Sequence, residues 1–418
     1  MESTVETVVL VLSAAVFAIV AMSGRLSRLS ITEPLVAVVL GIFVALLIGD
    51  PIDIRSPSAL IFLELALVLV LFTDAARIDI GHIRRQYRWP ARMLLIGLPL
   101  AMILGAVVSG WILGLPLGAA LLLGVILAPT DAALAEPVLE SEVLPVRIRQ
   151  SLNIESGLND GLALPALFIA MGLIESEAGR SISSSALLVI RQVGIGVAGG
   201  AVLGFAGAWV ISRATQHGWM DGLHQKIAAV ALALGTFAAV QILGGSGFVA
   251  AFVAGAVLGA QVRPKCEYLY EFADTEGRAL VLIAFVFLGA GPISRLIAEG
   301  VSWEAWVVSL LALFVVRPAA IAISLIGEKL LPSTVVFFGW FGPRGLATAV
   351  FLLVAFEEMT DLSPLVADIT FLTVALSVLL HGVTAMPASN WLAGRIELKH
   401  RREMPEMGEA FDHPTRSV

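Results

Sequence analysis

The stretch SLNIESGLNDGLALPALF, residues 151–168, places two carboxylates, Glu155 and Asp160, inside an otherwise apolar run. Ser156 and Asp160 are four residues apart, and so are Glu155 and Asn159, so that in a helix the four polar side chains form one stripe. A charged side chain at bilayer depth costs about 2.5–3.5 kcal/mol on insertion scales, so it faces a partner or a water-filled cavity rather than lipid. The stretch therefore predicts a membrane-spanning helix whose polar stripe is turned toward the interior of a helix bundle.

The composition is that of a chain that crosses a membrane many times. Its 418 residues are 58% hydrophobic and only 14% charged, and the mean hydropathy is +0.93. Apolar runs of about 18 or more residues, the length that a helix needs to cross a bilayer, recur along the chain. The single cysteine, Cys266, excludes a disulfide framework and a cysteine-based metal site. We therefore predict an all-α integral membrane protein.

Hydropathy predicts about thirteen transmembrane helices followed by a short polar tail. We expect them near 5–24, 33–50, 57–74, 91–114, 116–137, 148–173, 184–212, 224–244, 246–262, 275–292, 303–327, 334–357 and 365–393. A transmembrane domain then covers residues 1–394, and residues 395–418 form a short cytoplasmic tail, for which we expect little order. Most lysines and arginines fall in loops that this arrangement places inside the cell, as the positive-inside rule requires. The N-terminus is accordingly expected outside and the C-terminus in the cytoplasm.

Two of the expected spans should be broken in their interiors. The fifth contains Pro-Thr-Asp at 129–131, and the twelfth contains Gly-Pro-Arg-Gly at 342–345. Proline lacks a backbone N–H and glycine weakens a helix, so both spans should unwind at comparable depth. The group of spans one to six begins outside the cell, and the group of spans eight to thirteen begins inside. Two groups of six helices in opposite orientations are the pattern of an inverted repeat, as in secondary transporters. Prolines that merely kink packed helices are the alternative interpretation.

Five charged side chains are expected at membrane depth: Asp131, Glu155, Asp160, Arg317 and Arg344. Arg317 should lie at a depth similar to Glu155, and we expect a structural ion pair between them. Arg344 stands at the second break, where a fixed cation would neutralise the C-terminal end of a helix dipole. A set of ion pairs that only holds the helices together is the alternative for the whole group.

A shared proton and cation site follows from the two aspartates. Asp160 lies about twelve residues into its span, or about 18 Å deep at 1.5 Å per residue, near the midplane. An acidic group at that depth is neutralised by a proton or by a small cation. Alkali cations prefer oxygen ligands, and these are offered by Asp160, Asp131, Thr130, Ser156 and Asn159. Competition between a proton and a cation for one carboxylate is antiport.

Four motifs carry a resemblance to a known family. They are APTDAALAEPVL at 128–139, NIESGLNDG at 153–161, VVRPAA at 315–320 and FGPRGLATAVF at 341–351. In order and spacing they resemble the cation:proton antiporter-1 family, specifically its NhaP-type prokaryotic sodium/proton antiporters, over about residues 5–395. The Glu-Ser and Asn-Asp pairs at 155–160 are the most specific part of the resemblance.

The resemblance implies a role for each matching position. Asp160 would be the ion- and proton-binding carboxylate with Asn159 beside it, and Asp131, Thr130 and Ser156 would complete the Na⁺ site. Glu155 would belong to the same group through its pair with Arg317, and Arg344 would lie where the two unwound helices cross. The family fold has a six-helix core domain that moves against a dimerisation domain. A homodimer in the prokaryotic inner membrane is implied, without a cofactor, an enzymatic activity or a nucleic-acid partner.

The expected function is electroneutral exchange of Na⁺ or Li⁺ for H⁺ by alternating access, with a role in pH homeostasis. Asn159 cannot carry a proton charge, so only Asp160 changes protonation and one proton is exchanged per cation. A K⁺/H⁺ antiporter is the first alternative, because K⁺ can use the same oxygens. A sodium-coupled solute symporter and an intramembrane hydrolase with two aspartates are further alternatives, although few polar residues remain for an organic substrate.

Overall fold

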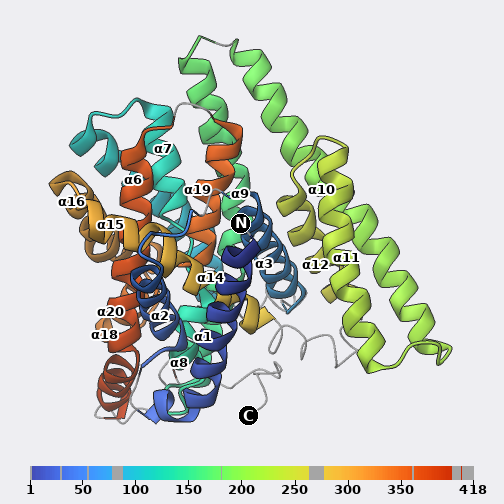
Figure 1. Ribbon diagram of the computed structural model, residues 1–418, viewed down its shortest axis with the longest axis horizontal. Helices are drawn as coiled ribbons and strands as arrows, with labels where there is room; N and C mark the ends of the chain where they lie inside the picture. The colour runs from blue at the N-terminus through green and yellow to red at the C-terminus, as the bar shows by residue number, and fades with distance from the viewer. Residues whose placement is uncertain are drawn as a thin grey trace. The chain divides into compact units, whose positions relative to one another are not determined.

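The computed structural model of the protein describes residues 2–28, 31–53, 56–77, 88–179, 181–262, 277–359, 362–397 and 406. All regular elements in these residues are helices, and none is a strand (Figure 1). The prediction of an all-α fold is confirmed. Cys266 and most of the expected tail, residues 398–405 and 407–418, lie outside the described residues.

The expected spans all correspond to helices. Among the described residues, 8 helical stretches are long and apolar enough to cross a membrane, and shorter apolar helices accompany them at Ser13–Leu26, Glu33–Ile48, Leu117–Ile126, Gly247–Val262 and Leu346–Phe356. Together they account for the predicted number. Several helices are longer than expected, among them Glu2–Arg28, Val146–Glu177, Ile182–Gln216 and Pro364–Glu397, because a helix continues into polar sequence after its apolar run has ended.

The chain divides into two compact units that alternate along the sequence. Unit 1 comprises the described residues of Met1–Leu63, Thr130–Asn153 and Ala279–Val418, and unit 2 those of Glu64–Pro129 and Ile154–Arg278. Unit 1 contains α1 (Glu2–Arg28), α2 (Glu33–Ile48), α8 (Ala132–Leu139), α14 (Arg278–Leu288), η3 (Gly289–Ile293), α15 (Ser294–Glu299), α16 (Trp303–Leu311), η4 (Ala312–Val316), α17 (Arg317–Ser324), α18 (Pro332–Trp340), α19 (Leu346–Glu358) and α20 (Pro364–Glu397). Unit 2 contains most of α3 (Pro57–Arg77) and of α9 (Val146–Glu177), with α5 (Arg88–Arg92), η1 (Met93–Gly97), α6 (Leu98–Leu113), α7 (Leu117–Ile126), α10 (Ile182–Gln216), α11 (Gly222–Ile242) and α12 (Gly247–Val262).

Glycines bring the helices of unit 1 into close contact. A Cβ on Gly41 of α2 would overlap the backbone carbonyl of Val286, and one on Gly289 of η3 would overlap that of Val38. Small residues at such positions let two helix backbones approach closely, which is how helices associate where water cannot drive them together. The long helix α20 packs against α2, α8, α16, α18 and α19. It is therefore the element of unit 1 that reaches both breaks described below.

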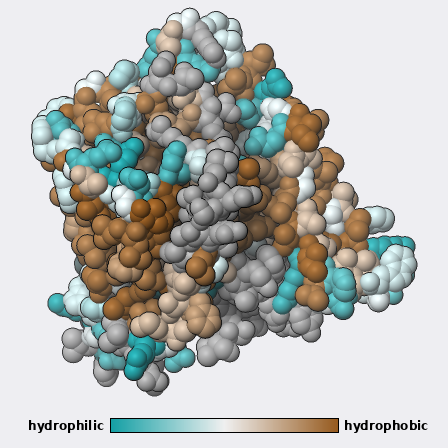
Figure 2. All heavy atoms as spheres, viewed as in Figure 1, coloured by the Kyte–Doolittle hydropathy of each residue, from teal (hydrophilic) through white to brown (hydrophobic). Residues whose placement is uncertain are grey.

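Unit 2 is assembled by the same kind of contact. In α10, Gly200 and Gly204 lie against Ala250 and Ala254 of α12, so that a side chain at either glycine would collide with the α12 backbone. The opposite side of α10 is apolar and open: the apolar window of Ser183–Gln216 is only 11% buried. Figure 2 shows brown side chains along α10 and α11 and teal ones at the turn that joins them. This distribution is expected of helices that face lipid.

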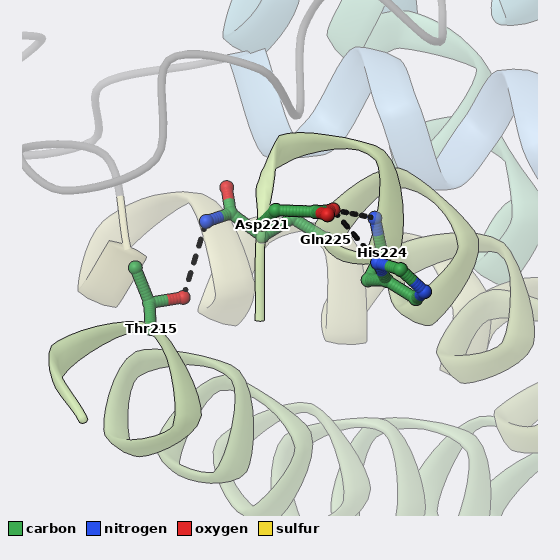
Figure 3. Close-up of polar contacts among 4 residues, drawn as sticks. All are labelled: Thr215, Asp221, His224 and Gln225. Carbon is green, nitrogen blue, oxygen red and sulfur yellow. Dashed lines mark hydrogen bonds and ion pairs between the residues drawn. The ribbon is translucent and has the colours of Figure 1, made fainter. Parts of the chain in front are cut away.

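Polar contacts close the turn between α10 and α11 (Figure 3). The Asp221 carboxylate accepts the backbone N–H of His224 at 3.0 Å and lies 2.7 Å from Nδ1 of the same residue. Gln225 donates from Nε2 to Oγ1 of Thr215 at 3.2 Å. Asp221 is thus the N-cap of α11.

One residue of the expected tail has a defined place. Glu406 is 1% exposed and its Oε1 accepts the backbone N–H of Leu331 at 2.8 Å and the Thr334 hydroxyl at 3.2 Å. Leu331 is the N-cap of α18 and has no side chain that can cap it, so Glu406 supplies the missing acceptor. Arg147 is close enough to Glu406 and Glu328 to interact with both electrostatically. Glu406 is thus the one described residue of residues 398–418, and the expected low order of the tail stays a prediction.

Candidate functional site

The first break lies between α7 and α8. Helix α7 ends at Ile126, residues 127–131 are not helical, and Asp131 begins α8 as its N-cap. Oδ1 of Asp131 accepts the backbone N–H groups of Ala133 at 2.8 Å and Leu134 at 3.3 Å. The predicted break is confirmed, and its polar end is an ordinary aspartate cap placed within a span.

The second break separates α18 from α19 and contacts the first. Residues 341–345 are not helical, and the N-cap of α19, Gly345, has no side chain to cap the helix. Oδ2 of Asp131 instead accepts the backbone N–H of Leu346, the first residue of α19, at 2.7 Å. The Asp131 N–H in turn donates to the Pro343 carbonyl at 2.7 Å. One carboxylate therefore caps two helices, α8 and α19.

Two buried arginines of unit 1, Arg317 and Arg344, lie at this second break. Arg344 is 1% exposed, and its Nη1 donates to the Gly342 carbonyl. Arg317, the first residue of α17, is 3% exposed, and a Cβ on Gly342 would overlap its guanidinium group. The structure thus places Arg344 at the interruption, where the sequence predicted it, and places Arg317 against the same loop.

Sequence reasoning missed two residues of α20 that hold this loop. Oγ of Ser377 accepts the backbone N–H of Arg344 at 2.6 Å. Nε2 of His381 lies 2.9 Å from the carbonyl of Trp340, the last residue of α18. The spacing of Ser377 and His381, one helical turn apart, was the available signal.

The polar stripe of the sixth span lies on α9, within unit 2. Glu155 is 1% exposed, Ser156 5%, Asn159 0% and Asp160 7%. Each takes part in a polar or electrostatic interaction within the protein. The next residue, Gly161, lies against Phe252 of α12, whose ring a Cβ would overlap. The predicted burial of all four side chains in one long helix is confirmed.

These residues fall into two groups. Asp131, Thr130, Arg317 and Arg344 belong to unit 1, whereas the stripe from Glu155 to Asp160 belongs to unit 2. A joint Na⁺ site of Asp160, Ser156, Asp131 and Thr130, and an ion pair of Glu155 with Arg317, each require residues of both units. Both therefore remain predictions of the sequence.

Comparison with protein families identifies the chain. Residues 11–391 match the transmembrane sodium/hydrogen exchanger family. The chain belongs to the sodium/hydrogen exchanger family. The expected resemblance to the NhaP-type antiporters of the cation:proton antiporter-1 group is thereby confirmed. The family is one of transporters.

Several named proteins resemble this chain. The K(+)/H(+) antiporter NhaP of Alkalimonas amylolytica is 25% identical over 331 residues, which are 79% of this chain and 57% of the relative. The Na(+)/H(+) antiporter NhaP of Pseudomonas aeruginosa is 25% identical over 345 residues, with 76% and 78% of the two chains covered. The chain thus spans little more than half the length of the potassium/proton relative that it matches.

A solved structure shows the same fold. The sodium proton antiporter MjNhaP1 from Methanocaldococcus jannaschii aligns with a TM-score of 0.71 at 23% sequence identity. The alignment covers 93% of this chain and 100% of that one. This chain therefore has the helical architecture of that antiporter.

Proposed function

We propose that the protein exchanges a monovalent cation for a proton, and that Asp160 is the carboxylate for which the two ions compete. The observation that carries the proposal is a buried acidic stripe in a long apolar helix: Asp160 is 7% exposed, and Ser156 and Asn159 lie on the same side of α9. A carboxylate buried at this depth must be neutralised by a proton or a cation before the protein can switch the access of its site from one side of the membrane to the other.

Asp131 has a different role from Asp160 in this proposal. Both Asp131 oxygens already accept backbone N–H groups, from Ala133, Leu134 and Leu346. Helix N-termini carry partial positive charge and stabilise an anion. We therefore propose Asp131 as the residue that anchors the two breaks and offers its remaining lone pairs to the cation, and Asp160 as the group that gains and loses the proton.

We propose Na⁺ or Li⁺ as the cation and one proton per cation. Support for sodium comes from the Pseudomonas relative, which is named a Na(+)/H(+) antiporter and matches over 78% of its length. K⁺/H⁺ exchange is the second candidate, because other relatives carry that name. The uncharged Asn159 beside Asp160 supports an electroneutral exchange. A transport rate that responds to membrane voltage at a fixed pH gradient would contradict that stoichiometry.

We further propose a homodimer in the prokaryotic inner membrane, with the N-terminus outside and the C-terminus in the cytoplasm. The described residues support a multi-pass membrane protein. The start of α9, the loop before α18 and the tail were all expected inside the cell, and Arg147, Glu328 and Glu406 from these three segments lie near one another in unit 1.

The proposal is tested in proteoliposomes that hold a pH gradient reported by a fluorescent dye. Na⁺, Li⁺ and K⁺ are added separately to the wild type, to Asp160→Asn and to Asp50→Asn, which removes an exposed carboxylate. We expect wild type and Asp50→Asn to dissipate the gradient on addition of Na⁺ or Li⁺, and Asp160→Asn to leave it intact. Dissipation by K⁺ alone would establish the second candidate, and undiminished exchange by Asp160→Asn would exclude the proposed role of Asp160.

A further inference from the structure

Side chains of α20 contact the backbone at both ends of the unwound segment 341–345. The backbone N–H of Arg344 donates to Oγ of Ser377 at 2.6 Å, and both residues are at most 1% exposed. A non-helical backbone at membrane depth has no regular hydrogen bonds of its own and no water to replace them. Ser377 therefore satisfies an amide that would otherwise be costly to bury.

His381 holds the other end of the segment. A carbonyl oxygen can only accept, and in the tautomer that carries its proton on Nε2 His381 donates to the Trp340 carbonyl at 2.9 Å. In the other tautomer Nδ1 donates to the Ser377 carbonyl within α20, also at 2.9 Å. Nδ1 lies 3.1 Å from Oγ of Ser377, which links the two side chains. The Trp340 indole packs on the His381 ring with 4.8 Å between centroids, and its Nε1 donates to Oγ1 of Thr384 at 3.0 Å.

The same segment is hydrogen-bonded to Asp131. Pro343, next to Arg344, accepts the Asp131 N–H at 2.7 Å, and Leu346, two residues beyond Arg344, donates to the Asp131 carboxylate at 2.7 Å. A shift of the segment would therefore move both contacts of Asp131 at once. The backbone thus links Ser377 and His381 to Asp131, although neither side chain is shown to touch it.

We propose that Ser377 and His381 are positioning residues for cation exchange: from α20 they fix the unwound segment 341–345 and, through it, Asp131. The inference rests on the proposed function, because it concerns how well the cation is bound. Loss of either contact lets the segment move, so that the protein binds its cation more weakly. Each substitution removes one contact with the segment together with the Ser377–His381 link, and we expect the half-saturating cation concentration to rise about five- to tenfold.

A matched control on the same helix separates this role from simple packing. Ser389 is 0% exposed, as is Ser377, but its hydroxyl donates only to the Ala385 carbonyl within α20, at 2.8 Å. Ser389→Ala therefore removes the same atom from an equally buried place without touching the segment. For the histidine, His381→Gln keeps a side-chain N–H that can reach the Trp340 carbonyl, whereas His381→Leu keeps only the bulk.

The experiment measures two quantities for Ser377→Ala, His381→Leu, His381→Gln and Ser389→Ala. The first is hydrogen–deuterium exchange of peptides that cover residues 341–350 in detergent, which needs no transport. The second is the half-saturating cation concentration and the maximal rate in proteoliposomes. We expect faster exchange and weaker cation saturation for Ser377→Ala and His381→Leu, and wild-type behaviour for Ser389→Ala and His381→Gln.

The outcomes distinguish the inference from the function on which it rests. If Ser377→Ala and His381→Leu saturate with cation as Ser389→Ala does, the positioning role is wrong, even while the wild type exchanges ions normally. If the wild type exchanges no cation, the proposed function is wrong, and the hydrogen-exchange comparison still decides whether the two side chains fix the segment. Equal exchange rates at 341–350 in all variants would overturn the inference in either case.

Discussion

The backbone N–H of Leu346 donates a 2.7 Å hydrogen bond to the carboxylate of Asp131, a residue 215 positions earlier in the chain. The other carboxylate oxygen caps α8, the helix that Asp131 itself begins. The N-terminal ends of two half-helices thus meet at one side chain, which ties the two interrupted spans together. Inverted-repeat transporters place their ions at such interruptions.

Asp131→Asn should destabilise the protein, because an amide has one acceptor oxygen where the carboxylate has two. Whichever way the amide turns, its NH₂ faces the backbone N–H of either Leu346 or Ala133. An unsatisfied buried donor costs about 1–3 kcal/mol, so the melting temperature in detergent should fall measurably. Asp50→Asn, on an exposed carboxylate, is the control and should melt as the wild type does. Equal melting of the two variants would show that the double cap contributes nothing.

Gly345→Ala should be more damaging than an ordinary glycine substitution. A Cβ at this position would overlap the Asp131 carboxylate, so Asp131 must move away from Leu346. Gly394, in α20, has nothing within 4 Å of a new Cβ, and alanine there should be neutral or stabilising by up to about 1 kcal/mol. We expect Gly345→Ala to lower both the melting temperature and the exchange rate in proteoliposomes. A Gly345→Ala protein that transports and melts normally would contradict the close approach.

Glu406→Ala should loosen the start of α18. The side chain is buried and accepts from Leu331 and Thr334, and loss of a helix cap costs about 0.5–2 kcal/mol. We expect the amides of residues 331–336 to exchange faster with deuterium and the melting temperature to drop. Glu142→Ala, on an exposed side chain of the same unit, is the matched control. Unchanged protection at 331–336 would mean that the tail does not cap the helix in solution.

The N-cap of α11 should fail at acid pH. The pKa of Asp221 lies below its ordinary value, chiefly because the carboxylate accepts the backbone N–H of His224 and is also bonded to the His224 ring. With a lowered folded-state pKa, the contribution of the cap is complete above the ordinary aspartate pKa of about 3.9. It is lost as the pH falls through the lower value. Protection of the amides of 222–226, corrected for intrinsic exchange, should therefore drop below about pH 4.

Asp221→Asn is the comparison for that titration, because an amide caps without titrating. Its protection at 222–226 should show no step in the same pH range. A step of equal size in both proteins would assign the loss to another acidic group.

The spans, the two breaks and the buried stripe could be predicted from the sequence alone. The spans follow from apolar length, and the breaks follow from Pro129 and Pro343, since proline cannot donate a backbone hydrogen bond. The burial of the stripe from Glu155 to Asp160 followed from spacing on one helix. Such features are local, and local patterns report them.

The missed features depend on contacts between distant segments. The sequence showed no hydrogen-bond partner for the Asp131 carboxylate, because its partners are backbone N–H groups. One of these groups, on Leu346, lies 215 residues away. Glu406 was assigned to a tail with little order, since its partner Leu331 is an apolar residue that no charge pattern singles out. His381 gave no sign that its acceptor is the carbonyl at the end of α18. No periodicity encodes which backbone group is left unsatisfied at a helix end.

The most direct test of the central claim is the release of protons when a cation binds. Na⁺ is added to the detergent-solubilised protein in weakly buffered solution, and a pH indicator reports the protons set free, because a cation that takes a carboxylate displaces its proton. We predict about one proton per chain for the wild type and for Asp50→Asn, and none for Asp160→Asn. Undiminished proton release by Asp160→Asn would contradict the account, since the proton and the cation would then not share that carboxylate.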